Sequence, residues 1–136
     1  MSLNSKIEQF KHLHDSERCL LIPNPWDCGT ALILQDLGFQ ALATTSAGLA
    51  FSKGMKEESL ELEVKLQHCR DLAKVTTVPI SADMQKCFAV SPEGVSTVID
   101  QVMETGVAGC SIEDASGDPE KPIFDFQYIC LNMLLI

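Results

Sequence analysis

The sequence predicts an α/β protein, and more narrowly the first half of a (β/α) barrel of the TIM type, from three observations. First, four short apolar runs alternate with segments that have helical spacing of apolar residues. Second, every one of these runs ends on a polar or acidic residue. Third, the chain has 136 residues, whereas a closed barrel of eight units usually takes roughly 250. The four predicted strands are CLLIPN (19–24), ALATTS (41–46), PISAD (79–83) and GCSIED (109–114).

The ends of the predicted strands carry the candidate functional residues. These are Asn24, Thr45 and Ser46, Asp83, and Glu113 and Asp114. In a (β/α) barrel the carboxyl ends of the strands converge on one face, where the chemistry of that fold is done. A doubly wound sheet would also have near-continuous apolar strands. It concentrates its site at one switch point, however, and the segment PNPWDCG after the first run is not a Gly-rich phosphate loop.

The first two helices have recognisable limits. Residues 3–15 carry apolar side chains at helical spacing, which predicts a helix that covers one end of the sheet. Asp27 is well placed to cap a second helix, which runs to about Leu37 and is ended by Gly38. The stretch 46–59, with Gly48 and Gly54 as hinges, is predicted to be a loop over the mouth of the barrel.

Two further helices complete the alternation. Ser59 is the expected cap of a long helix that reaches about Val75. Ser91 and Pro92 open the last helix, and Gly106 closes it. We therefore expect one domain, a half-barrel over residues 1–126, followed by an apolar tail at 127–136.

The composition excludes several classes of binding partner for this domain. A formal net charge of -9 argues against nucleic acid and against anionic membrane surfaces, because both require a surplus of Lys and Arg. No apolar run reaches the ~20 residues of a membrane span, and no basic segment followed by an apolar core marks secretion. We expect a cytoplasmic protein whose ligand is a small molecule.

Neither the cysteines nor the histidines predict a site. No two of the six cysteines have the two-residue spacing of zinc ligands, and four lie in or beside apolar segments. We expect reduced thiols that pack as small hydrophobes. His12, His14 and His68 lie away from every predicted strand end, so we expect no catalytic role for them.

Longer segments resemble a known family. They are LIPNPWDCGTALILQDLGFQALATTSAGLAFSKG, PISADMQKCFAVSPEGV and GVAGCSIEDASGD. In order and spacing they resemble the Asn-x-Trp-Asp, Thr-Ser-Ala-Gly, Ala-Asp-Leu-Glu and Leu-Glu-Asp-Ala segments of the phosphonomutase-like branch of the phosphoenolpyruvate mutase/isocitrate lyase superfamily. The resemblance implies a barrel enzyme that uses Mg²⁺ to hold a small α-keto acid or dicarboxylate. It also implies an enolate that forms while a C–C or P–C bond is made or broken.

The resemblance assigns roles to particular residues. Asp83 and Glu113 match the metal-site acids, and two carboxylates on neighbouring strands are a suitable pair for Mg²⁺. A single acid at a strand end is more often a helix cap, which is how we interpret Asp27, and Asp114 is assigned a structural role. Ser46, with the backbone amides of Ala47 and Gly48, matches the segment that holds the substrate carboxylate.

The chain also departs from the family pattern. Gln85 stands where the family has a second acid; its carbonyl can accept from a metal-bound water, but one negative charge is lost. Cys87-Phe88-Ala89 replaces a glycine-flanked aromatic residue, so we expect this loop to take another path. Glu57 could substitute for an acid of the preceding loop. Lys121 is too weak a signal to be named an acid or base, so no catalytic residue is assigned.

Two functions remain open from the sequence. The first is a Mg²⁺-dependent lyase or phosphonomutase. The second is a non-catalytic half-barrel that associates with a second copy, since the unpaired edges of an open parallel sheet favour pairing. The tail YICLNMLLI does not resemble the family's continuation, which would supply a substrate-binding arginine on a fifth strand. On either interpretation we expect a homo-oligomer.

Overall fold

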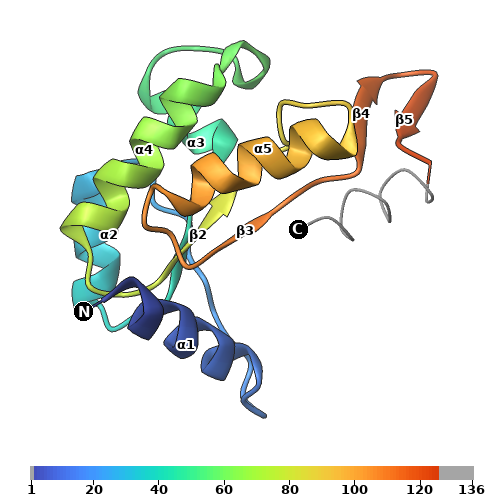
Figure 1. Cartoon of the computed structure of the whole chain (residues 1–136). Coiled ribbons are helices and arrows are strands. Elements are labelled where there is room, and N and C mark those ends of the chain that lie inside the picture. The colour runs from blue at the N-terminus through green and yellow to red at the C-terminus, as the bar shows by residue number, and fades with distance from the viewer. Residues whose placement is uncertain (1, 126–136) are drawn as a thin grey trace.

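The structure is a computed structural model that describes residues 2–125. The predicted tail at 127–136 therefore lies outside the described residues. Within the described range, helices and short strands alternate along the chain, and a small hairpin follows the last parallel strand (Figure 1).

Three parallel strands form the sheet, in the order β1 (Leu42–Ala43), β2 (Ile80–Asp83) and β3 (Gly109–Ser111). The register pairs Leu42 with Ile80 and Ala82 with Cys110. Spatial order equals chain order, as in consecutive strands of a barrel, whereas a doubly wound sheet reverses direction at its switch point. The sheet is thus a partial barrel, as predicted.

The prediction of a first strand at 19–24 is wrong, because the structure has no strand there. One backbone hydrogen bond joins this segment to β1, from Ala43 N–H to Pro23 O at 3.1 Å. Pro23 and Pro25 lack the N–H groups that a regular ladder would need. The side chain of Asn24 adds two contacts, in which Nδ2 donates to Ala43 O (3.1 Å) and Thr44 O (3.3 Å).

Helix α1 (Leu3–His14) covers one end of the sheet, as predicted (Figure 1). Its Phe10 ring lies so close to β3 that a Cβ on Gly109 would be 3.1 Å from the ring. On the same helix, buried Lys6 donates from Nζ to Ala73 O (3.2 Å) and Thr76 O (2.9 Å). These contacts attach α1 to the C-terminal end of the helix Leu62–Val75.

Helix α2 (Cys28–Asp36) begins and ends near the predicted positions. The Asp27 carboxylate accepts from Thr30 N–H at 2.8 Å, and the Thr30 hydroxyl accepts from Asp27 N–H, which forms a reciprocal capping box. Gly38 follows the helix with φ of 93°, a left-handed conformation that glycine adopts without steric cost. The predicted roles of Asp27 and Gly38 are therefore confirmed.

The stretch 46–59 contains helical turns, so the prediction of a loop is wrong. Helix α3 (Ser46–Ser52) starts directly after β1, and a 3-10 turn, η1 (Glu57–Ser59), follows it. The Thr45 hydroxyl caps α3 by accepting from Gly48 N–H at 3.3 Å. Because α3 begins at Ser46, the predicted strand 41–46 is cut to two residues.

The last two helices pack over the sheet. Helix α4 (Leu62–Val75) has Glu61 at its N-cap without a side-chain hydrogen bond, so the assignment of Ser59 as its cap is wrong. Helix α5 (Pro92–Met103) begins as predicted, with the Ser91 hydroxyl accepting from Gly94 N–H at 3.1 Å. Gly106, with φ of 87°, follows its end.

An antiparallel hairpin that the sequence did not predict comes after β3. Its strands are β4 (Ala115–Asp118) and β5 (Lys121–Ile123), and it extends away from the helices (Figure 1). The predicted strand 109–114 is therefore shorter, ending at Ser111.

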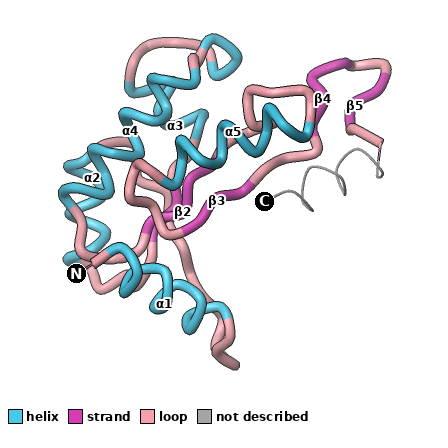
Figure 2. Tube along the Cα trace, viewed as in Figure 1, coloured by secondary structure: helices cyan, strands magenta, loops and turns pink. Residues whose placement is uncertain are grey.

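The core lies between the sheet and helices α2, α4 and α5, and Figure 2 shows how short the strands are beside these helices. Its largest fully buried apolar side chains include Leu42, Leu66, Leu72, Ile80, Met84, Val95 and Val102. Among residues 2–125, no helix is long and apolar enough to cross a membrane.

Candidate functional site

The carboxyl ends of β1 and β2 are joined through the side chain of Asp83. Ser46 donates to Asp83 Oδ2 from its backbone N–H (2.8 Å) and from its hydroxyl (2.5 Å). Gln85 N–H donates to Asp83 Oδ1 at 3.1 Å. On the other side, Asp83 N–H donates to the hydroxyl of buried Thr44 at 2.8 Å. The position of the carboxylate is thus fixed by residues on two adjacent strand ends.

Asp83 is held in its ionised form. Burial alone would raise its pKa, but the hydrogen bonds from Ser46 and Gln85, together with the charge of Lys65, outweigh this effect. The pKa of Asp83 is consequently lower than that of an ordinary aspartate.

Lys65 is a functional candidate that the sequence analysis missed. It projects from α4 and is only 3% exposed. Its ammonium donates to Ser46 Oγ at 2.5 Å and to Gln85 Oε1 at 3.4 Å, and it lies 5.5 Å from the centre of the Phe88 ring. Burial lowers the pKa of Lys65, and the charge of Asp83 is the largest influence in the opposite direction.

A signal for Lys65 does exist in the sequence. Lys65 lies one helical turn before Cys69 and two turns before Leu72, and both are buried on the apolar face of α4. A lysine in an otherwise apolar helical stripe must either extend to solvent or find buried partners. The identity of those partners required the structure.

Gln85 connects this cluster to two more acids. Its Nε2 donates to Glu57 Oε1 at 3.2 Å, and its backbone carbonyl accepts from Glu113 N–H at 2.7 Å. Burial and the charges of Asp83 and Glu57 raise the pKa of Glu113. The structure therefore brings Glu57, Asp83, Gln85 and Glu113 together, and we call these four residues the acidic cluster.

The segment expected to hold a carboxylate is partly engaged by the protein itself. Both donors of Ser46 bind Asp83, and Gly48 N–H donates to the capping Thr45. Gly48 also permits a close approach, because a Cβ there would lie 2.3 Å from Trp26 Cδ1. Among the described residues, the amide of Ala47 has no hydrogen-bond partner.

The other residues singled out from the sequence form their contacts elsewhere, although the charge of Asp114 also helps to raise the pKa of Glu113. Lys121 forms an exposed ion pair with Asp125 at 2.7 Å. Asp114 is exposed, and its backbone carbonyl accepts from Phe124 N–H. His12 and His14 belong to α1. His68 belongs to α4, where burial lowers its pKa.

The cysteines of the described residues are free thiols. Cys69 and Cys87 are buried in the core, Cys28 and Cys110 are half-buried, and Cys19 is exposed. Cys130 lies outside the described residues.

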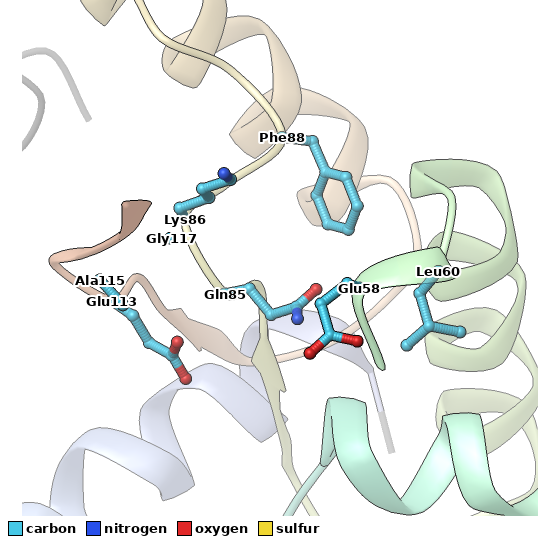
Figure 3. A pocket seen from close by; sticks show the side chains of 8 residues that line it. All are labelled: Glu58, Leu60, Gln85, Lys86, Phe88, Glu113, Ala115 and Gly117. Atoms are coloured by element: carbon cyan, nitrogen blue, oxygen red, sulfur yellow. The ribbon is translucent and has the colours of Figure 1, made fainter. Parts of the chain in front are cut away.

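A pocket of about 290 Å³ adjoins the cluster. It lies between η1, the loop after β2 and the hairpin, and in the view of Figure 3 Gln85 is placed among its lining residues. The lining consists of Glu58, Leu60, Gln85, Lys86, Phe88, Glu113, Ala115 and Gly117. The acids thus have an open space beside them that is large enough for a small ligand.

The loop after β2 has an unusual backbone. Gln85, Cys87 and Phe88 have φ values of 51°, 65° and 54°. These are left-handed conformations, which cost an L-residue roughly 1–2 kcal/mol. The loop therefore has backbone angles that side chains resist, and the expected departure from the family's path stays a prediction.

The oxygen donors of the cluster suit a hard cation with few protein ligands. Among residues 2–125, no group of three His, Cys, Asp or Glu residues is arranged to hold a metal. Asp83 and Glu113 nevertheless repel each other enough to contribute to the raised pKa of Glu113. A cation between them would relieve that repulsion, and Mg²⁺ usually takes one or two carboxylates, with waters completing its shell. The pair fits such an ion.

Fold and site together define a class: a partial (β/α) barrel whose strand ends carry acids beside a small pocket. The sequence model of one such family, phosphoenolpyruvate phosphomutase, matches residues 10–133, which includes the first residues of the segment 127–136. The chain belongs to this family.

Individual relatives agree with this membership. The 2-methylisocitrate lyase of Escherichia coli (strain K12) is 29% identical over 119 residues, which is 86% of this chain and 40% of the relative. The crystal structure of a proposed lyase/mutase from Burkholderia cenocepacia J2315 has a TM-score of 0.93 and 39% identity, covering 98% of this chain and 48% of that one. The chain thus spans less than half the length of these two relatives.

A phosphonopyruvate hydrolase solved with oxalate and Mg²⁺ has the same fold. Its TM-score is 0.90 at 18% identity, over 99% of this chain and 47% of that one. At this identity the likeness shows the fold alone.

Proposed function

We propose that this chain carries the metal- and carboxylate-binding part of a Mg²⁺-dependent enzyme. Its substrate is a small α-keto acid or dicarboxylate, and its reaction makes or breaks a C–C or P–C bond through an enolate. The observation that carries this proposal is the convergence of Asp83, Gln85 and Glu113 beside the pocket. Support also comes from the family membership and from the phosphonopyruvate hydrolase that was solved with oxalate and Mg²⁺.

Each residue has a role in this proposal. Asp83 and Glu113 would hold the ion, and the carbonyl of Gln85 would accept from one of its waters. When bound there, Mg²⁺ would stabilise the negative charge that an enolate places on oxygen. Ser46 orients Asp83 through its two hydrogen bonds. The amide of Ala47 is the donor in this segment that we assign to a substrate carboxylate.

Calorimetric titration of oxalate, a mimic of enolpyruvate, tests the proposal. We expect oxalate to bind in the presence of Mg²⁺ and not in the presence of a chelator. Asp83→Ala and Glu113→Gln should each abolish binding, and Glu113→Gln is the safer variant because Glu113 is exposed. Asp100→Asn changes an exposed acid on α5 and is the matched control. Equal binding with and without Mg²⁺ would contradict the proposal.

One observation favours a second function, a non-catalytic half-barrel that associates with itself. Within residues 2–125, β1 and β3 each pair with a single strand, β2, so both edges of the sheet lack a strand partner. Analytical ultracentrifugation that shows a dimer, together with an absence of Mg²⁺-dependent oxalate binding, would support this alternative. The expected homo-oligomer and the cytoplasmic location remain predictions.

A further inference from the structure

We propose that Lys65 is a resident cation of the acidic cluster and that its charge weakens the binding of Mg²⁺ there. This inference rests on the metal site proposed above and concerns a residue that had no role in the sequence analysis. Lys65 would therefore determine how tightly the site binds a divalent ion.

The contacts of Lys65 are those of an ammonium group in a built site. Its Nζ donates to Ser46 Oγ at 2.5 Å and to Gln85 Oε1 at 3.4 Å. On another side it faces the Phe88 ring, with 5.5 Å between Nζ and the ring centre, an arrangement that favours a positive charge. With 3% exposure, water can do little to screen that charge.

The acids around Lys65 are those of the proposed metal site. Asp83, Glu57 and Glu113 all interact electrostatically with Lys65. Three carboxylates and one ammonium leave a net charge of about -2 where the acids alone would give about -3. A divalent ion that enters the cluster is attracted by the acids and repelled by Lys65 at the same time.

Gln85 joins Lys65 to the proposed metal site. Its carbonyl oxygen, the atom proposed to accept from a metal-bound water, already accepts from Lys65, while its Nε2 donates to Glu57. The amide thus bridges a cation and an acid. A carboxylate at position 85 would instead neutralise the lysine and restore the attraction for a divalent ion.

Other lysines do not account for these effects. Lys6 is buried, but its ammonium donates to Ala73 O and Thr76 O at the C-terminal end of α4. Lys86 lines the pocket, but it is exposed and donates to Ser116 O in the hairpin. Within the described part of the chain, Lys65 is the lysine buried among the acids.

Titration of Mg²⁺ alone, followed by calorimetry, tests the inference without any measurement of activity. We expect Lys65→Met and Lys65→Gln to bind Mg²⁺ at least tenfold more tightly than the wild type, because a nearby repulsive charge is gone. Lys65→Arg keeps the charge and should stay within about threefold of the wild type. Adding Glu113→Gln to each variant should remove the gain, which would locate the ion at this cluster.

A further variant guards against misfolding, since removal of one partner from a buried charged cluster is destabilising. Gln85→Glu keeps Lys65 and its contacts, and it should give a gain similar to that of Lys65→Gln. Unchanged affinity in Gln85→Glu and in the folded Lys65 variants would overturn the inference, and Mg²⁺-dependent oxalate binding would still stand. If no variant binds Mg²⁺, the inference and the proposed metal site both fail. A gain of equal size in Lys65→Arg would also overturn it, because charge would not be the cause.

Discussion

At the scale of single residues, the site depends on buried polar groups that satisfy one another. Asp83 accepts from Ser46 and Gln85, and Lys65 donates to the hydroxyl of the same Ser46. Such networks are stabilising only when every member is paired, because an unpaired buried charge is costly. Ser46 is therefore a link between a buried cation and a buried anion, in addition to its expected part in ligand binding.

Buried thiols make the stability of the domain sensitive to alkaline pH. Burial raises the pKa of Cys69 to about 11, above its value in the unfolded chain. A raised pKa in the folded state gives stability that is complete below the unfolded value, near pH 9, and is lost as the pH rises toward 11. We expect the free energy of unfolding to fall by about 2 kcal/mol over this range because of Cys69.

Urea denaturation between pH 8.5 and 10.5 would measure this fall. Cys69→Ala should show a shallower slope with pH than the wild type, whatever its stability at neutral pH. Cys19→Ala removes an exposed thiol and should keep the wild-type slope. Identical slopes in all three proteins would show that Cys69 does not contribute.

The candidate acids were predictable from the sequence, and their surroundings were not. Asp83 and Glu113 end apolar runs, and a parallel sheet brings such ends to one edge. Lys65 belongs to a helix, so its contact with Ser46 depends on the rotation of α4 against the sheet. That rotation follows from packing of the whole core, which no local pattern encodes.

At the scale of elements, helix caps give a direct comparison within the chain. Asp27 caps α2 through a reciprocal pair of hydrogen bonds with Thr30, whereas Glu61 occupies the same position before α4 with no side-chain bond. We expect Asp27→Ala to lower the free energy of unfolding by about 1 kcal/mol. Glu61→Ala should change it by less than about 0.5 kcal/mol. Chemical denaturation of both variants measures the difference, and equal losses would contradict it.

The loop after β2 carries backbone strain next to the pocket. Phe88 has φ of 54°. At such an angle a protein with alanine should be less stable than a protein with glycine. We expect Phe88→Gly to be more stable than Phe88→Ala by about 1 kcal/mol. Both variants lose the ring and its contact with Lys65, so their difference isolates the backbone. Denaturation midpoints measure it, and a more stable Phe88→Ala would contradict the assignment of strain.

The elements differ in how far their sequences define them. Helices α1, α2 and α5 have apolar spacing and capping residues, and they were predicted close to their observed limits. The strands were overestimated, because Pro23 and Pro25 prevent a regular ladder at 19–24 and because α3 begins at Ser46, inside the predicted strand 41–46. The 115–123 hairpin is exposed and has no apolar alternation, so the pattern that signals a strand is absent there.

At the scale of the whole molecule, the fold is a set of consecutive βα units with all strand ends at one edge. The sequence predicted this architecture because alternation and polar strand ends are properties of the chain as a whole, and small errors in strand limits do not alter them. The arrangement concentrates acids from η1, β2 and the segment after β3 beside a single pocket. We infer that this cluster binds a divalent ion.

Mn²⁺, a paramagnetic substitute for Mg²⁺, tests this claim most directly through NMR spectra of the folded chain. We predict that substoichiometric Mn²⁺ broadens the amide signals of residues 83–86 and 111–114 first, and that excess Mg²⁺ restores them. Glu113→Gln should abolish the selective broadening. Broadening that is spread over the exposed acids of α4 and α5, or that survives in Glu113→Gln, would contradict a metal site at the strand ends.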